Sequence, residues 1–337
     1  MIKEKLTPPP GLHVILGGSA GGIFNRNYSR RDLLVDQDVL SVGPTPRCAD
    51  FAAWNAMREQ FWSTCLPEKL MHPVENIARH PDRLRSAELI NLWAATGVSE
   101  QLSIAFSVDV IDTFGIDAAR LRLLQFERLP GRQYSRIVGM GELNEANMAN
   151  HPPPRPFTRD ELDDYRAAWA ALSSPDPRLI EQFATTRPGA NNWLKQAMHL
   201  MLRRFPNRSS GLTHWDHLLL RMVPGSGPTA GRVMAHAMTE HLEDVDPVGD
   251  VYMLGRLKRM ADARLPKPLI EMGGDLTSIR YGDVTVALTP FGREVLDGKA
   301  SSYPINPIDD WAAGVHLSSR EGNLWFNKGG RLVSATR

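Results

Sequence analysis

A short apolar run that ends in a cluster of glycines constrains the fold of this chain more than any other feature. Residues 12–16 read LHVIL, and GGSAGG follows directly at positions 17–22. A run of this kind before glycines is typical of a buried strand that enters a tight turn. The pattern predicts a strand, a glycine-rich turn and then a helix that begins near Gly21.

The same alternation continues through the first 150 residues. Apolar runs at 33–35, 88–93 and 121–126 predict three further strands, and residues 49–65 and 99–114 have the spacing of helices. Strands that alternate with helices favour a parallel sheet with right-handed crossovers. We therefore expect an α/β fold, with an open, mostly parallel, Rossmann-like sheet over residues 1–150. Its ligand should lie at the carboxyl ends of the strands, where the glycine turn is.

The second half of the sequence predicts helices. The stretch HPPPRP at 151–156 is typical of a stiff linker, because each proline fixes φ and restricts the residue before it. Thr158 and Glu161 then fit a capping box. Further helices are expected at 191–205, 213–223, 229–242 and 250–264, followed by two short strands around 281–283 and a helix capped by Thr289. This order predicts a helical, winged-helix-like region at 157–300 and a C-terminal hairpin tail at 301–337 that turns at 328–330.

The charge composition of the chain limits the classes of partner that we expect it to bind. The 337 residues carry 39 Lys and Arg against 38 Asp and Glu, with a formal net charge of +1. A chain without a basic excess lacks the general attraction for nucleic acids and anionic membranes, so neither is an expected partner. The apolar run at 12–16 is too short for a signal sequence or a membrane span, which favours a cytoplasmic protein. Cys48 and Cys65 fit neither a disulfide framework nor a zinc motif.

Several motifs resemble those of an uncharacterised bacterial family, a domain of unknown function. They are the segments 13–21 (HVILGGSAG), 38–44 (DVLSVGP), 58–62 (REQFW), 211–212 (GL), 288–292 (LTPFG) and 309–317 (DDWAAGVHL). The first motif of the family usually reads His-x-x-x-Gly-Asp-Ser-x-Ala-Gly, and Gly18 stands here in place of its Asp. Asp310 stands where the family usually has Arg. The resemblance covers most of the chain and supports the architecture, but it carries no established activity.

The glycine turn is the leading candidate for a ligand site. Gly17, Gly18, Gly21 and Gly22 would let backbone N–H groups approach an anion at a helix N-terminus with no side chain in between. The turn is not a Walker A loop, which needs Gly-Lys-Ser/Thr, and it matches Gly-x-Gly-x-x-Gly only loosely. A tight structural turn is the alternative interpretation. The expected ligand is anionic or nucleotide-like, and the pattern specifies no cofactor.

Ser19 is placed as the nucleophile is in Gly-Asp-Ser-Leu hydrolases, directly after the first predicted strand. Such a serine needs a histidine base that an acid orients. Ser19, Asp38 and His316 are the catalytic candidates, although His316 follows Asp309 by seven residues and lacks the short Asp-x-x-His spacing of those enzymes. A role for Ser19 as a cap or an anion contact is therefore the favoured interpretation.

Polar residues near the end of the second predicted strand should border the same crevice. Asp36 and Asp38 end that strand and Ser41 follows, and acids at this position bind ribose hydroxyls or a metal, or cap a loop. Arg47 and Arg58 are candidate anion partners. For each of these residues taken singly, a solvated or structural role is the favoured interpretation.

Two functional hypotheses remain open. The first is a small-molecule protein, an enzyme of transferase or hydrolase type in preference to a binding protein, that holds an anionic ligand over residues 17–22. The second is a ligand-responsive regulator whose winged helix binds DNA or protein. The locally basic helix at 250–264 would make the DNA contact, so its charge, and any masking by the tail at 311–316, distinguish the two. The histidine pairs at 214/217 and 236/241 lack a metal-site spacing, and no metal is predicted.

Overall fold

A five-stranded sheet forms the centre of the first half. The computed structural model describes residues 5–29, 32–48, 50–66, 73–129, 136–186, 191–240, 246–276 and 281–335. The strand order is β2-β1-β4-β5-β6, and the first four strands are parallel while β6 is an antiparallel edge. The strands are β1 (Leu12–Leu16), β2 (Leu33–Asp36), β4 (Ile90–Ala94), β5 (Leu121–Gln125) and β6 (Arg155–Pro156). The predicted α/β class with a mostly parallel sheet is confirmed.

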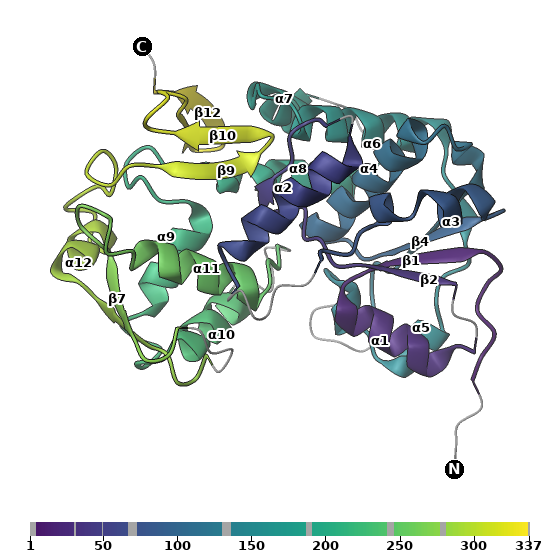
Figure 1. Cartoon of the computed structure of the whole chain (residues 1–337), viewed down its shortest axis with the longest axis horizontal. Coiled ribbons are helices and arrows are strands. Elements are labelled where there is room, and N and C mark those ends of the chain that lie inside the picture. The colour runs from purple at the N-terminus through teal and green to yellow at the C-terminus, as the bar shows by residue number, and fades with distance from the viewer. Residues whose placement is uncertain are drawn as a thin grey trace.

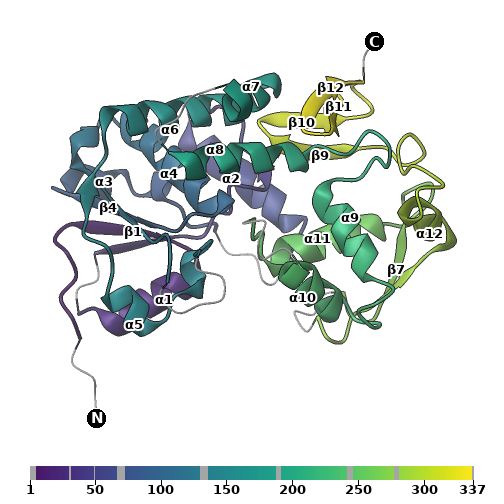
Figure 2. The same ribbon diagram turned by 180° about the vertical axis from the view of Figure 1, so that it is seen from behind.

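Helices cover both faces of this sheet (Figures 1 and 2). Helices α1 (Gly18–Asn27) and α5 (Glu145–Ala149) lie on one face, where Ile23 and Phe24 pack against Ile15 and Trp93. Helices α4 (Val98–Thr113), α6 (Arg159–Leu172) and α8 (Asn192–Met201) lie over the other face. Every residue of β1 and of β4 is buried, as expected for parallel strands that are covered on both sides.

The first helix begins three residues earlier than its sequence indicates. Gly17 has a φ of 90° and precedes the helix, and the Gly21 amide already donates to the Gly17 carbonyl at 3.1 Å. A non-glycine residue at position 17 would be strained at this φ. Gly21 is required for another reason, because a Cβ there would lie 2.5 Å from a methyl group of Val35 on β2. Gly17 therefore allows the turn before α1, and Gly21 allows the close contact between α1 and β2.

The cores do not follow the predicted boundary at residues 151–156. Part of that stretch forms β6, which pairs with β5. Helices α6 and α8, with α7 (Arg178–Thr186) between them in sequence, share one apolar core with the sheet and with α4. The capping box of Thr158 and Glu161 starts α6 as expected, whereas α7 was not predicted. The α/β half therefore includes helices that the sequence assigned to the second region.

The second half has its own core. Its elements are α9 (His214–Met222), α10 (Ala230–Glu240), α11 (Asp250–Met260), the antiparallel pair β7 (Ile270–Gly273) and β8 (Thr285–Leu288), and α12 (Pro290–Leu296). Helix α2 (Phe51–Ser63) runs between the two halves (Figure 1). Trp54 near its start packs in the core of the α/β half, and Trp62 near its end packs in the core of the second half. The short helix α3 (Pro81–Ser86) follows before β4.

The C-terminal tail returns to the first half. Strands β9 (Asp309–Ala313) and β10 (Val315–Ser318) form one antiparallel pair, and β11 (Trp325–Lys328) and β12 (Arg331–Ser334) form another around Gly329 and Gly330. β9 also pairs in parallel with β3 (Gly43–Pro44). The tail thus holds two strand pairs where one hairpin was expected, and it joins a loop that follows β2.

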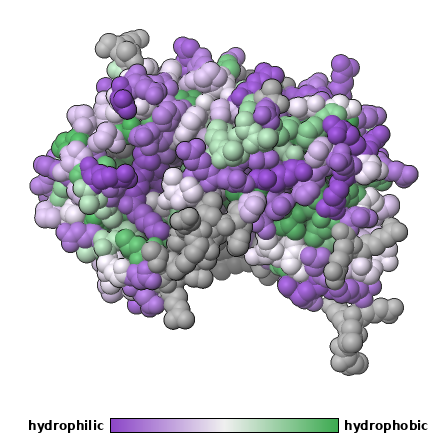
Figure 3. Space-filling view, viewed as in Figure 1, coloured by the Kyte–Doolittle hydropathy of each residue, from purple (hydrophilic) through white to green (hydrophobic). Residues whose placement is uncertain are grey.

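The face shown in Figure 3 is mainly hydrophilic, and its hydrophobic residues form separate patches. The large exposed hydrophobic residues of the described chain are scattered in sequence, at Leu6, Leu179, Met238, Leu276 and Ile305. No helix in the described ranges is long and apolar enough to cross a membrane.

Candidate functional site

The N-terminus of α1 is open at the carboxyl edge of the sheet. Gly18 and Ser19 are exposed, and no side chain caps the helix within the described chain. A Cβ at Gly17 would have no neighbour within 4 Å, and one at Gly18 would meet only the Gln37 amide nitrogen at 3.9 Å. The first amides of a helix have no partner inside the helix and carry a partial positive charge. This end of α1 can therefore accept an anionic group without displacing protein atoms.

The glycine turn lies at the point in the sheet where the strand order reverses, so that later strands are added on the other side of β1. The chain passes from β1 to β2 on one side and then crosses to β4 on the other, so β1 and β4 flank the switch point. Ligands of open parallel sheets bind at such points. Helix α4 begins after Gly97 at the carboxyl end of β4, also without a side-chain cap in the described chain. The amides of Thr96 and Gly97 are taken, because they donate to the carbonyls of Ile137 and Val138 in the segment after β5.

That segment lies near the start of α1 and bonds the first turn of α4. A Cβ at Gly141 would lie 3.9 Å from the Ser19 Cβ, and the Met140 amide donates to the Glu100 carboxylate at 2.8 Å. Glu100, in the first turn of α4, is buried, and burial raises its pKa to about 8 although amides of Met140 and Ala95 donate to it. The exposed side of the glycine turn is therefore that of Gly17, Gly18 and Gln37.

The acids predicted to line a ligand crevice are buried in the protein. Asp36 ends β2 with 1% exposure, and its Oδ2 has no hydrogen-bond partner in the described structure. Burial, and then the charge of Asp38, raise the pKa of Asp36 to about 8. The charge of Asp36 also raises the pKa of Glu100. Both carboxyls are largely neutral at pH 7, so neither repels an anion at the turn.

Asp38 and Arg58 form an internal ion pair with no exposed surface. The guanidinium of Arg58 in α2 donates to both oxygens of Asp38, with a shortest distance of 2.6 Å, and to three backbone carbonyls. The Trp62 indole also donates to Asp38 at 3.0 Å. Both side chains were expected to face a ligand. Their hydrogen bonds are instead used to fix α2 against the loop after β2.

The remaining predicted residues are divided between the glycine turn and other parts of the molecule. Gly21 and Gly22 lie in the first turns of α1, and Gly21 is buried against β2. Ser41 is buried, and its hydroxyl bonds the Ser99 hydroxyl at 2.7 Å near the start of α4. Arg47 is exposed on the segment before α2, and its charge acts on Asp109 of α4. Neither Ser41 nor Arg47 is in contact with the glycine turn in the described hydrogen bonds.

No histidine in the described ranges forms a hydrogen bond with Ser19. His316 lies on β10, where it bonds Asp309 at 2.7 Å and stacks on Trp311, far from α1 in Figure 1. His13 lies on β1, but it accepts from the Trp93 indole at 2.9 Å and contacts the Pro9 carbonyl. Burial lowers the pKa of His13 to about 4. The structure thus separates Ser19, Asp38 and His316, and it does not assemble the expected catalytic set.

Gln37 is the residue of this site that sequence analysis missed. It follows Asp36 directly, is exposed, and its amide is the side-chain group nearest to Gly18. The signal was the alternation of a strand, because Leu34 and Asp36 point into the core and the next residue must point out. The sequence analysis selected the acids on either side, Asp36 and Asp38, and not the amide between them.

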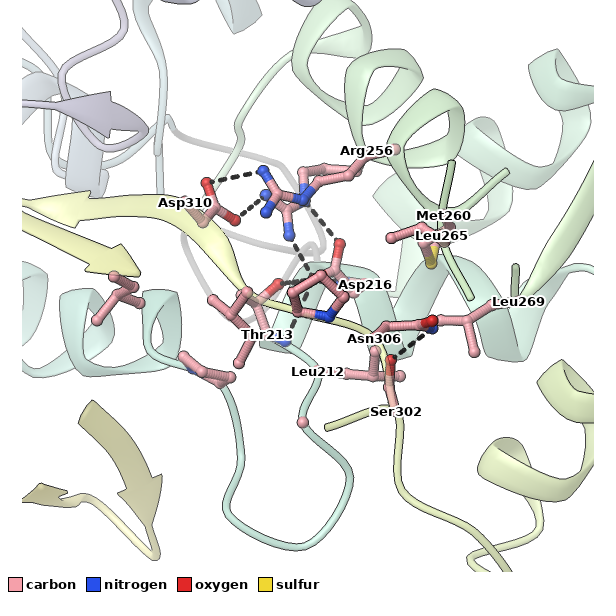
Figure 4. Close-up of a pocket in the computed structure, with 16 residues that line it drawn as sticks. Leu212, Thr213, Asp216, Arg256, Met260, Leu265, Leu269, Ser302, Asn306 and Asp310 are labelled. Atoms are coloured by element: carbon pink, nitrogen blue, oxygen red, sulfur yellow. Dashed lines mark hydrogen bonds and ion pairs between the residues drawn. The ribbon is translucent and has the colours of Figure 1, made fainter. Parts of the chain in front are cut away.

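A cavity lies between α9, α11 and the tail, with a volume of about 60 Å³ (Figure 4). Asp216 and Asp310 meet Arg256 at one wall, and Asn306 donates to Ser302 at another. Asp216 also accepts from the Thr213 amide and hydroxyl. These polar groups satisfy one another, so this cavity is a structural joint. No cluster of three or more metal-ligating side chains occurs within the ranges that the structure describes.

Comparisons with known proteins place the chain in no characterised group. No family model matches it, and no curated protein matches it. Among solved structures it is similar to the DNA-binding, cleavage and re-ligation domain of Plasmodium falciparum topoisomerase II, with 13% sequence identity and a TM-score of 0.45. The match covers 98% of this chain and 57% of that chain. A likeness this distant defines neither a fold family nor a function.

Proposed function

We propose that the α/β half binds a small anionic ligand, such as the phosphate group of a nucleotide-like molecule, at the N-terminus of α1. The observation that carries the proposal is the uncapped and open helix end at Gly17 and Gly18 beside the switch point. The backbone amides of the first turn, the Ser19 hydroxyl and the Gln37 amide would hold the anion. The buried, neutral carboxyls of Asp36 and Glu100 support this role, because ionised acids there would oppose it.

The function that we propose for this site is ligand binding, and it does not require catalysis by Ser19. An enzyme of transferase or hydrolase type would need a base for Ser19, and the two histidines considered for it have other partners. Ser19 as an anion contact requires only its proton. Reaction chemistry at this site would then come from the bound molecule or from a second substrate.

Isothermal titration calorimetry with inorganic phosphate and with AMP tests the proposal. Ser19→Ala should weaken binding by about 0.5–1.5 kcal/mol, or up to about 3 kcal/mol for a charged acceptor, because the backbone amides remain. Ser63→Ala is the matched control, since that exposed hydroxyl at the end of α2 bonds only its own helix. The proposal fails if neither probe binds the wild type, or if the two variants bind alike.

We further propose that the second half is a winged-helix-like module that serves packing or protein contacts. The order α9, α10, α11, β7, β8 supports it, as does a bridge between Thr229 and Thr285 that adds a third short segment to the pair. In α11, the helix that would read DNA, Arg256 binds Asp216 and Asp310, and Arg259 donates to the Asp309 carbonyl. Both arginines are therefore bound to residues of the tail strand β9.

The regulator hypothesis predicts a tight complex with duplex DNA, and the packing proposal predicts none. Fluorescence anisotropy at about 150 mM salt should show at most weak, non-specific binding, because few cations are left to neutralise phosphates. A nanomolar, sequence-specific complex would restore the regulator hypothesis and overturn this proposal.

A further inference from the structure

Arg136 is a half-buried cation that forms no ion pair with an acid in the described ranges. Its guanidinium donates to the hydroxyl of Thr96 at 2.7 Å, to the carbonyl of Thr96 at 3.0 Å, and to the side chain of Gln196 at 2.8 Å. It also stacks on the ring of Trp193, 4.2 Å from the ring centroid. Burial lowers the pKa of Arg136 to about 10, so the group is still charged at pH 7. The groups that hold this cation in place are therefore neutral.

The guanidinium of Arg136 keeps hydrogen-bonding capacity for a ligand. An arginine side chain has five N–H groups. Three of those of Arg136 donate to Thr96 and Gln196, so two have no acceptor within the described chain. A planar guanidinium suits a phosphate or a carboxylate, because two oxygens of such a group accept from it side by side. Since Trp193 and Thr96 already fix its plane, its orientation is set before a ligand binds.

A second arginine lies directly opposite Arg136. Arg128 and Arg136 form an antiparallel bridge, and the Ile137 amide donates to the Glu127 carbonyl beside it. This is the pattern of a pair without hydrogen bonds of its own, in which the facing side chains start about 5 Å apart. Arg128 is exposed and forms no ion pair with another described residue. Like charges that face each other in this way are unfavourable, and an anion bound between them would relieve the repulsion.

The acids near this pair bind other groups. Glu127 precedes Arg128, but its carboxylate accepts from the Trp193 indole at 3.4 Å. Glu142 accepts from two backbone amides at the start of its own turn. The sequence from 128 to 136 reads RLPGRQYSR and contains no Asp or Glu. Neither acid is therefore a described partner of the two arginines.

The two arginines lie at the same edge of the sheet as the glycine turn. Thr96, which Arg136 bonds, follows β4, and Arg128 follows β5. Strands β1, β4 and β5 are parallel neighbours, so the arginines are about one to two strand spacings, of about 4.8 Å each, from the end of β1. The segment after Arg136 then leads to Gly141, where a Cβ would lie 3.9 Å from the Ser19 Cβ. One nucleotide spans such a distance.

We propose that Arg136 and Arg128 bind a second anionic group of the ligand whose first phosphate lies at α1. The ligand is then a small molecule with two separate anionic groups, of the nucleoside bisphosphate class. Arg136 binds the second group through its two remaining N–H groups, and Arg128 attracts it from the other side of the bridge. The inference rests on the proposed function, because it adds a group to the ligand of that site. Arg136 is the residue that selects a bisphosphate over a monophosphate.

Calorimetry with adenosine 3′,5′-bisphosphate tests the proposal, with AMP and adenosine 3′-monophosphate as separate probes. The wild type should bind the bisphosphate at least about tenfold more tightly than either monophosphate, because only the bisphosphate makes charge-assisted hydrogen bonds at both positions. Arg136→Met should remove this preference. Arg320→Met is the matched control, because this exposed arginine follows β10, which lies far from α1 in Figure 1.

Two further variants keep the test decisive. Arg128→Glu, at an exposed position, should weaken binding of the bisphosphate about fivefold relative to Arg320→Glu, even if Arg136→Met fails to fold. The inference is overturned if the bisphosphate binds no better than AMP, or if the variants of Arg136 and Arg128 keep the wild-type preference. Gly18→Asp tests the other end of the ligand. Bisphosphate binding that needs the arginines but survives Gly18→Asp would contradict the site at α1 alone and support the arginine site.

Discussion

Two regions of this molecule bury carboxyl groups in opposite ways. At the carboxyl edge of the sheet, burial raises the pKa values of Asp36 and Glu100 to about 8. At the joint of α9, α11 and β9, Asp216 and Asp310 both bind the guanidinium of Arg256. Burial alone would raise the pKa of Asp310, but Arg256 and Arg259 outweigh burial and lower it.

The difference shows that formal charge in a sequence is a poor guide to the charge that a partner meets. The segment 250–264 has several basic residues, yet Arg256, Arg259 and Arg264 all bind acids or carbonyls of the same chain. The glycine turn has no charged residue, yet its open helix end is electropositive. An electropositive group is therefore open at the turn, where the sequence shows no charge.

The largest expected effect comes from breaking the joint. Arg256→Met should lower the free energy of unfolding by about 3–5 kcal/mol, because it leaves the buried carboxylate of Asp216 without its cation and that of Asp310 with Arg259 alone. Arg166→Met is the control, since Arg166 pairs with Asp112 at the surface, where ion pairs contribute about 0–1 kcal/mol. Urea unfolding of both variants measures the difference. Equal losses would mean that the joint is no more than a surface contact.

The pH dependence of stability should reflect the raised pKa values of Asp36 and Glu100. A carboxyl with a raised pKa keeps its proton in the folded state while the unfolded chain releases it. Stability therefore falls as pH rises from about 4 towards 8, by up to about 1.4 kcal/mol per pH unit for each group.

Glu100→Gln should flatten that decline, because it removes one of the two titrating carboxyls. Urea unfolding at pH 5, 6, 7 and 8 measures the slope. Glu88→Gln, at an exposed position, should leave the slope as in the wild type. A Glu100→Gln profile that is parallel to the wild type would show that Glu100 is ionised in the folded protein.

Local signals in the sequence predicted much of the fold. The apolar run before the glycines gave β1, and the capping box of Thr158 and Glu161 gave the start of α6. The pairing of β3 with β9 could not be predicted, because two-residue strands have no pattern and the partners lie about 270 residues apart in sequence. Helix α7 has nine residues, as α9 has, but it follows Pro175 and Pro177 and buries only Ile180, Phe183 and Ala184, so its short apolar stripe was missed.

The candidate site was predicted in its backbone and not in its side chains. Gly17, Gly18 and Ser19 lie where the pattern placed them, at the carboxyl end of β1. Asp38 and Arg58 were both selected as ligand contacts, but they bind each other. Residue types that suit an anion or a metal also suit a buried ion pair, and only the tertiary structure shows which partner each has.

A smaller effect should separate the glycines of α1 by their surroundings. Gly21→Ala should cost about 1–3 kcal/mol, because its Cβ would overlap Val35. Gly22→Ala is the matched control, since a Cβ there would meet only the end of the Arg26 side chain at 3.6 Å. Ala at an open helical position stabilises by about 0.5–1 kcal/mol relative to Gly. Thermal unfolding should therefore shift in opposite directions for the two variants, and a shift in the same direction would contradict the packing of α1 on β2.

The account depends most on the open N-terminus of α1, and Gly18→Asp tests it directly. The position has room for a side chain and ordinary helical backbone, so the new carboxylate should stabilise the helix end by about 0.3–1 kcal/mol. The same carboxylate would take the place of the anion, so calorimetric binding of AMP at α1 should be lost while the protein becomes slightly more stable. Unchanged binding of AMP by a stable Gly18→Asp protein would contradict the proposed site.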